Sequence, residues 1–254
     1  MNILCKISVL LALIFVSTGL TAEDVVAPRT GYYELSMTPA DVLGEPGSQG
    51  IADILPADKI IDWQVYVPKS YSAASPPGVV VFVSSWHRGG PPKAWNYLLE
   101  ENNLIWIGAN NSGNGLPVAP RMLKAIIAPA VLSRRYAIDP ERCYVAGFSG
   151  GGMTATRIAT AKPELFKGGI YMGGTVFWNE NTPPKIDLIK QNHHVFLVGT
   201  YDPAQKTTRK VYKGYIEAGV KNAELITIRN HRHRMPPPAY FEKAINYLDS
   251  RLVQ

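Results

Sequence analysis

The feature that most constrains this chain of 254 residues is an alternation, from residue 61 onward, of short apolar runs with stretches of helical spacing. The run at residues 79–83 is continuous and mostly β-branched, which is typical of a strand buried on both faces of a parallel sheet. The alternation predicts an α/β fold with a mostly parallel sheet, helices on both faces and a functional site at the carboxyl ends of the strands. Strands are expected at residues 62–67, 79–83, 104–108, 143–148, 169–172, 195–199 and 225–228, and helices at 95–101, 121–136, 149–162, 207–218 and 239–252.

The first 22 residues differ from the rest and are predicted to be a secretory signal peptide. Lys6 gives a short basic start, residues 9–16 are uninterruptedly apolar, and Ala22 is a small residue at a cleavage point. The alternative is a membrane anchor, but the apolar run is too short to span a bilayer. We therefore expect a periplasmic or secreted protein.

Residues 23–60 are interpreted as an N-terminal extension of uncertain structure. A short strand is expected at 34–37, and the glycine, proline and serine content of 43–51 predicts a loop. The main domain is then predicted to span residues 61–254.

Charge and cysteine content exclude several classes of function. Loss of Lys6 with the signal lowers the formal charge from +6 to +5, and no cluster of Lys and Arg is large enough to predict a nucleic-acid partner. Cys143 is then the single cysteine, so we expect a buried core thiol and no internal disulfide. His231 and His233, without a carboxylate or cysteine beside them, make a weak metal pair, and no metal is expected.

Residues 147–151, Gly-Phe-Ser-Gly-Gly, follow one predicted strand and precede a predicted helix. A G-x-S-x-G sequence in this context is typical of a sharp turn that presents a serine nucleophile, here Ser149. Small neighbours permit the strained backbone of such a turn. The turn would leave the Gly150 amide at a helix N-terminus, free to bind an oxyanion. The alternative is a glycine-rich turn that serves only packing.

A serine hydroxyl needs an adjacent base, and the position of each histidine in the predicted sheet selects the candidate. His231 and His233 follow the last strand, at the edge where Ser149 is expected. His233 is preferred because three prolines and the last helix follow it closely, with a structural histidine as the alternative. His193 and His194 precede their strand, so we expect them on a surface loop at the opposite edge.

The base must itself be held by a third group, and Asp202 is the predicted one. It follows the strand at 195–199, again at a carboxyl end, with a turn or helix-capping role as the alternative. Ser149, Asp202 and His233 thus come from three separate strands, in the order that hydrolases of this layout use.

The loop after residues 79–83 should supply the second oxyanion donor. The Trp86 amide is the first choice and the Ser85 amide the second. Residues 172–195 would form only a short cap region, so the serine is expected to be open to solvent. Trp178 in this cap, together with Trp86 and Tyr201, is predicted to line an acyl or aromatic pocket, with structural packing as the alternative for each.

With these residues in view, the chain from about residue 61 to 252 resembles the α/β-hydrolase superfamily, and within it secreted esterases related to polyhydroxybutyrate depolymerases and feruloyl or acetylxylan esterases. The similar stretches are residues 139–152, residues 198–202, and His233 with the prolines that follow it. The resemblance implies a carboxylic ester hydrolase with a Ser-Asp-His triad and no cofactor. The chain departs from many relatives at residues 84–85, where Ser-Ser replaces His-Gly, and in lacking the disulfides of extracellular depolymerases.

The predicted function is therefore a serine carboxylic ester hydrolase that forms an acyl-enzyme with a small-molecule or polymeric ester. The alternatives are a serine peptidase of the prolyl-oligopeptidase type, an acyltransferase, and a non-catalytic binding protein on the same scaffold. No stable membrane span is expected once the signal is removed.

Overall fold

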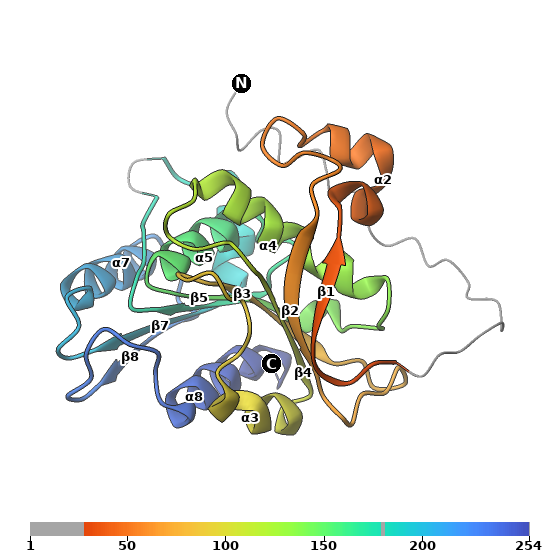
Figure 1. Ribbon diagram of the computed structural model, residues 1–254. Coiled ribbons are helices and arrows are strands. Elements are labelled where there is room, and N and C mark those ends of the chain that lie inside the picture. Colours follow the sequence, from red (N-terminus) through yellow and green to blue (C-terminus); the bar gives the residue numbers. More distant parts are fainter. Residues whose placement is uncertain (1–27, 179–180, 254) are drawn as a thin grey trace.

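The computed structural model describes residues 28–178 and 181–253, and its centre is an eight-stranded sheet in the order β1-β2-β4-β3-β5-β6-β7-β8 (Figure 1). β2 runs antiparallel to its neighbours β1 and β4, and the other pairs are parallel, so the prediction of a mostly parallel sheet is confirmed. The strands are β1 Gly31–Met37, β2 Ile61–Val67, β3 Gly78–Val83, β4 Leu104–Ala109, β5 Cys143–Phe148, β6 Gly168–Met172, β7 His193–Gly199 and β8 Ala223–Ile228.

Helices cover both faces of this sheet. In Figure 1, α4, α5 and α7 lie on one face, and α3 and α8 lie on the other. The α-helices are α2 Pro39–Gln49, α3 Asn96–Glu101, α4 Val118–Ser133, α5 Gly150–Ala161, α6 Ile186–Gln191, α7 Gln205–Glu217 and α8 Pro238–Asp249, with 3₁₀ turns η2 Lys93–Trp95, η3 Pro140–Arg142 and η4 Ser250–Val253. Within the described ranges, no helix combines the length and the apolar composition needed to cross a membrane.

Alternate side chains of the central strands enter two separate hydrophobic cores. In β3, Val79, Val81 and Val83 contribute to the core under α4, whereas Val80 and Phe82 contribute to the core on the opposite face. All five are nearly inaccessible to solvent. This two-sided burial is the reason that the strand is a continuous apolar run with no polar alternation.

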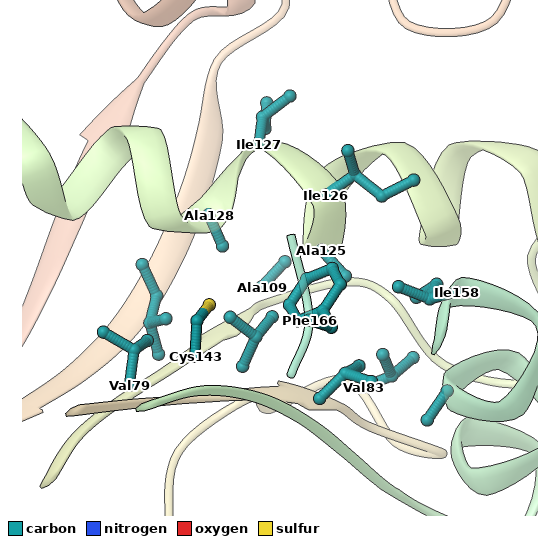
Figure 2. Packing of buried hydrophobic residues seen from close by; sticks show 14 of the residues in the cluster. Val79, Val83, Ala109, Ala125, Ile126, Ile127, Ala128, Cys143, Ile158 and Phe166 are labelled. Carbon is teal, nitrogen blue, oxygen red and sulfur yellow. The ribbon is translucent and has the colours of Figure 1, made fainter. Parts of the chain in front are cut away.

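Figure 2 shows the core between the sheet and α4, where Val79, Val83 and Cys143 of the strands face Ala125 and Ala128 of the helix. Small residues on α4 allow the helix to approach the sheet closely. Cys143 is a free, buried thiol, and desolvation raises its pKa to about 12. It therefore stays a neutral core residue.

The segment before β2 is more regular than its sequence indicates. β1 extends the sheet by pairing along its whole length with β2, from Gly31 opposite Val67 to Met37 opposite Ile61. Residues 43–51, expected as a loop, lie mostly in α2, so that expectation is wrong. Thr38 and Asp41 form a capping box that begins the helix, and Gly44, at φ 70°, absorbs a kink within it. The predicted signal peptide, residues 1–22, lies outside the described residues.

The strand order places a topological switch point between β3 and β5. The chain goes from β3 outward to β4 and then returns past β3 to form β5. The loops that follow β3 and β5 therefore leave toward opposite faces, and the carboxyl ends of these strands leave a crevice between them. Ser149 directly follows β5, so the fold puts it at this crevice.

His193 and His194 are buried at 3% and 1% exposure, so the expectation that they lie on a surface loop is wrong. They are the first two residues of β7, paired with Gly168 and Gly169 of β6, and the His194 ring packs against the rings of Tyr171 and Tyr215. His194 Nε2 lies 3.0 Å from the Ile189 carbonyl oxygen, so it donates there, and Nδ1 accepts from the Tyr171 hydroxyl at 2.9 Å. Burial is the main reason that the pKa of His194 falls from 6.5 to about 4.

This buried neutral imidazole makes stability depend on pH. Because its pKa is lower in the folded state, the unfolded chain binds more protons below pH 6.5, and stability is lost as pH falls from 6.5 toward about 4. A shift of this size corresponds to about 3 kcal/mol. We expect His194→Gln to flatten the fall in unfolding free energy between pH 7 and pH 4, measured by urea denaturation. The exposed His87 is the control, and an identical slope in His87→Gln and His194→Gln would contradict the assignment.

Candidate active site

Ser149 has the strained backbone of a nucleophile turn. Its φ of 56° and ψ of −125° lie in a region that non-glycine residues rarely adopt. The backbone around it is packed too closely to admit side chains: a Cβ on Gly147 would overlap the Gly151 carbonyl, and a Cβ on Gly151 would overlap the Val83 carbonyl. The Ser149 amide donates to the Met172 oxygen at 2.8 Å, which ties the turn to β6. The glycines are thus needed for the approach of the turn to its neighbouring strands.

The structure brings the three predicted triad residues into one hydrogen-bonded chain. His233 Nε2 lies 2.9 Å from Ser149 Oγ, and His233 Nδ1 lies 3.0 Å from both carboxylate oxygens of Asp202. Since the carboxylate only accepts, Nδ1 carries the proton, and Nε2 is left to accept from the serine hydroxyl. These contacts are the geometry required of a nucleophile, a base and an orienting group.

The environment of Asp202 fixes the direction of its carboxylate. Its side chain is 2% exposed, while that of His233 is 38% exposed. Oδ1 also accepts from the Ala204 amide at 2.8 Å, so the turn role considered as an alternative exists together with the contact to His233. The Tyr201 amide donates to the His231 carbonyl at 2.9 Å, which joins the loop after β7 to the loop after β8. Backbone bonds therefore set the distance between the carboxylate and the imidazole.

His231, the less favoured base, has a structural position. It is buried, and its Nε2 donates to the Arg234 carbonyl at 3.1 Å within the same loop. This contact shapes the segment that carries His233. The histidine beside Ser149 is His233, which was preferred because three prolines and the last helix follow it in the sequence.

Aromatic rings form a stack beside the triad. The Trp86 ring lies 5.3 Å from the Phe148 ring at an interplanar angle of 17°, and the Phe148 ring lies 4.9 Å from the His233 ring. Trp86 is nevertheless 53% exposed, so its outer face is available to a ligand. The Trp86 side chain thus has the position expected of a pocket residue.

The candidate oxyanion donors differ in whether their amides are already engaged. The Gly150 amide opens α5 and has no acceptor in the part of the chain that the structure describes, as expected for a first helical residue. The Trp86 amide donates to the buried Ser84 Oγ at 3.0 Å, which weighs against it as the first choice. The Ser85 amide has no acceptor among the described residues.

The other two predicted pocket residues lie in different surroundings. Tyr201 is 63% exposed, and it contributes its backbone amide to the loop contact described above. Trp178 packs against Phe177 and against Tyr215 of α7, at ring distances of 4.3 and 4.6 Å. Trp178 therefore has the packing role that was the alternative to a place in the pocket. Contact of Trp178 or Tyr201 with a substrate stays a prediction.

Two features of the site were not predicted from the sequence motifs. Gly173, at φ 58°, follows β6, and a Cβ there would lie 3.0 Å from Asp202 Oδ2 and 3.3 Å from His233 Nδ1. Asn114, in the loop after β4, has its carboxamide against Gly150. A glycine pair directly after a predicted strand, Gly173 and Gly174, was the available sign of a close approach at the sheet edge.

A hollow in the described part of the protein lies away from the triad, beside β1, which is four strands away from β5. Its lining contains no histidine, cysteine or aspartate: Pro28, Arg29, Tyr33, Glu34, Leu35, Ser36, Arg135 and Tyr136. It therefore offers no alternative to the triad as a catalytic centre.

Comparison with known proteins agrees with this geometry. Residues 126–225 match the prolyl oligopeptidase family (Peptidase_S9), a span that includes Ser149 and Asp202 and ends before His233. No curated protein matches the chain in sequence.

Solved structures of esterases and peptidases superpose on this chain. A thermostable esterase matches with TM-score 0.61 and 16% identity over 88% of this chain and 63% of that protein. A protein assigned as a dipeptidyl aminopeptidase IV from Bacteroides ovatus matches with TM-score 0.59 and 15% identity over 87% of this chain and 36% of its own length. Esterase 2 of Thermogutta terrifontis, with bound butyrate, matches with TM-score 0.55 and 15% identity over 77% of this chain and 90% of that protein.

These similarities establish an α/β-hydrolase fold, and the predicted fold class is confirmed. The chain spans only about a third of the B. ovatus protein and less than two thirds of the thermostable esterase. The family match and the neighbours agree on the class of serine hydrolases, which here includes both esterases and peptidases.

The contact between Gly173 and the triad gives a test of the site geometry. In Gly173→Ala, the positive φ should cost about 1–2 kcal/mol, and the added methyl would press on Asp202 and His233. We expect a fall in kcat together with a lower melting temperature. Gly31→Ala is the matched control, since Gly31 has φ 79° but no atom within 4 Å of the added methyl. It should lose stability alone, and an equal loss of kcat in both variants would contradict the assignment.

Proposed function

We propose that the protein is a serine carboxylic ester hydrolase. The observation that carries this proposal is the continuous chain of contacts from Ser149 Oγ to His233 and on to the buried carboxylate of Asp202. In this proposal, Ser149 Oγ attacks the ester carbonyl carbon while His233 Nε2 takes the hydroxyl proton. Asp202 holds the imidazole tautomer and stabilises the imidazolium.

The remaining steps use the same groups. The tetrahedral intermediate collapses when the carbon–oxygen bond to the alcohol breaks and His233 gives its proton to the leaving oxygen. Water then attacks the acyl carbon and loses a proton to His233. The bond from this carbon to Ser149 Oγ breaks, His233 returns the proton to Oγ, and the acid leaves. The Gly150 amide at the start of α5 donates to the oxyanion in both steps.

Two observations favour an ester over a peptide as the substrate. Among the described carboxylates, only Asp202 is hydrogen-bonded to His233, and no second carboxylate is bonded to Ser149 or His233. Neighbours of similar length to this chain are esterases, including one with bound butyrate. A butyrate-sized acyl group is therefore a reasonable first substrate.

A peptidase of the prolyl-oligopeptidase type is the second candidate, because the family match at residues 126–225 carries the serine and aspartate of the triad. Within the esterases, we propose an aromatic, acetyl or hydroxyacyl group as the substrate's acyl part, because the chain resembles feruloyl, acetylxylan and polyhydroxybutyrate-type enzymes. The exposed Trp86 ring offers a surface for a planar group.

Removal of the serine nucleophile tests the reaction class. We expect Ser149→Ala to reduce kcat for p-nitrophenyl butyrate on the order of 10⁶-fold, and to lose fluorophosphonate labelling, because Ser149 is the only described serine whose hydroxyl is hydrogen-bonded to a histidine. The exposed Ser70 gives the matched control Ser70→Ala, which should behave as the unchanged protein. Labelling that survives in Ser149→Ala would refute the assignment.

The same assay separates the two candidate substrates. Turnover of p-nitrophenyl acyl esters should exceed turnover of prolyl and alanyl p-nitroanilides at equal concentration. Faster release from an anilide than from any ester would instead support the peptidase. A series with acetyl, butyryl and feruloyl esters then ranks the acyl groups.

We also propose that the protein is exported to the periplasm or secreted, on the basis of the basic and apolar character of residues 1–22. Mass spectrometry of protein purified from an extracytoplasmic fraction should give an N-terminus at Glu23. Full-length protein confined to the cytoplasm would contradict this proposal.

A further inference from the structure

The loop between β4 and α4 lies against the loop that follows β3. The Asn114 amide donates to the Ser85 carbonyl at 3.2 Å, and the Asn111 amide donates to the His87 carbonyl at 2.7 Å. Gly113 lies close enough that a Cβ on it would be 2.9 Å from the Trp86 oxygen. The loop at residues 110–115 is therefore part of the wall that faces the candidate oxyanion hole.

The Asn114 side chain extends from this loop to the other wall of the site. A Cβ on Gly150 would overlap Asn114 Oδ1 and would lie 2.7 Å from Cγ and 3.1 Å from Nδ2. The carboxamide thus touches the residue whose backbone amide is the first oxyanion donor. Its Nδ2 has no acceptor within the described residues, although Asn114 itself is largely exposed. An amide donor without a protein partner stands beside the nucleophile turn.

Arg121 orients this carboxamide from beneath. It is 4% exposed, and it donates through Nε to the Ser112 carbonyl at 2.7 Å and through Nη2 to the Ser84 carbonyl at 3.0 Å. Nη2 also lies 3.5 Å from Asn114 Oδ1. Because the guanidinium only donates, Oδ1 is the atom held toward it, and the Nδ2 hydrogens are left for another acceptor.

The position of Arg121 is costly for the fold. No carboxylate of the described residues forms an ion pair with it, and it lies in the first turn of α4, where the helix dipole disfavours a cation. Burial lowers its pKa, and the nearby Arg157 adds to this effect. Residues that break local rules in this way concentrate at functional sites, and this one lies where negative charge would develop.

We propose that the Asn114 carboxamide is the second donor of the oxyanion hole and that Arg121 is the residue that positions and polarises it. This inference rests on the proposed esterase function and adds a residue to that site. It accounts for the Ser-Ser at residues 84–85: a side-chain amide takes the role for which the Trp86 amide, bonded to Ser84 Oγ, is not free. The bond from Arg121 to Oδ1 draws electron density from the amide and makes Nδ2–H a stronger donor.

Substitution of Asn114 by aspartate separates a donor from a structural role. Asn114→Asp keeps the shape and the oxygen that faces Arg121 but replaces the Nδ2 donor by a carboxylate oxygen. A structural role would survive this change, with unaltered or higher melting temperature and normal turnover. We expect instead that kcat/KM for p-nitrophenyl butyrate falls on the order of 10²-fold, mainly in kcat, in both Asn114→Asp and Asn114→Ala.

An oxyanion mimic gives a readout that packing alone would not change. A trifluoromethyl ketone forms a tetrahedral adduct with the serine, and its Ki should rise in Asn114→Ala by about the same factor as kcat/KM falls, while KM changes little. Asn246→Ala is the matched control, since Asn246 is exposed on α8, on the opposite face of the sheet, and it should leave both values unchanged. Arg121→Lys should weaken the same two values, with melting temperature reported to separate loss of fold.

The outcomes distinguish this inference from the proposed function. If unmodified protein neither hydrolyses esters nor labels with fluorophosphonate, the proposed function fails and the inference fails with it. If unmodified protein does both and Asn114→Asp keeps its kcat, the esterase assignment stands and Asn114 is not a donor; Ser85 would then be the donor. A fall in kcat without a rise in the Ki of the ketone would also overturn the inference.

Discussion

The close approach of backbone to backbone around Ser149 is the constraint on which the site depends. The serine can take its strained φ only because Gly147, Gly151 and Gly174 allow three segments to pack against the turn without side chains. The bond from the Ser149 amide to the Met172 oxygen then holds the turn to β6. Backbone contacts with the sheet therefore fix the position of the Ser149 hydroxyl.

The same sheet positions the groups that accompany the serine. Asp202 and His233 follow β7 and β8, and the bond between Tyr201 and His231 joins their loops. The switch point between β3 and β5 brings the loop with Ser85 beside the turn, and the return of the chain from β4 adds the loop with Asn114. Each of these loops contributes one functional group to the site. The loops lie at one edge of the sheet because the strands that they follow are parallel.

Sequence patterns predicted the features that follow from the periodicity of buried residues and from distinctive turn sequences. The buried strands of the parallel sheet and the order of the triad residues followed from apolar runs and from G-x-S-x-G. Four features did not follow. α2 depends on a capping box and a kinked glycine inside a segment rich in helix breakers. His194 is buried because it lies within β7, where its ring packs against Tyr171 and Tyr215. The engagement of the Trp86 amide by Ser84, and the contact of Asn114 with Gly150, depend on loop conformation, which no local pattern encodes.

The His233 side chain is partly open to water. If Ser149 carries an acyl group, bulk solvent reaches the carbonyl carbon from the same side as the departed alcohol. An enclosed site can favour capture of the acyl group by a second alcohol, whereas an open site exposes it to bulk water. For the proposed acyl-enzyme, access of water would therefore set the partition between hydrolysis and transfer, and an open rim would favour release of the free acid.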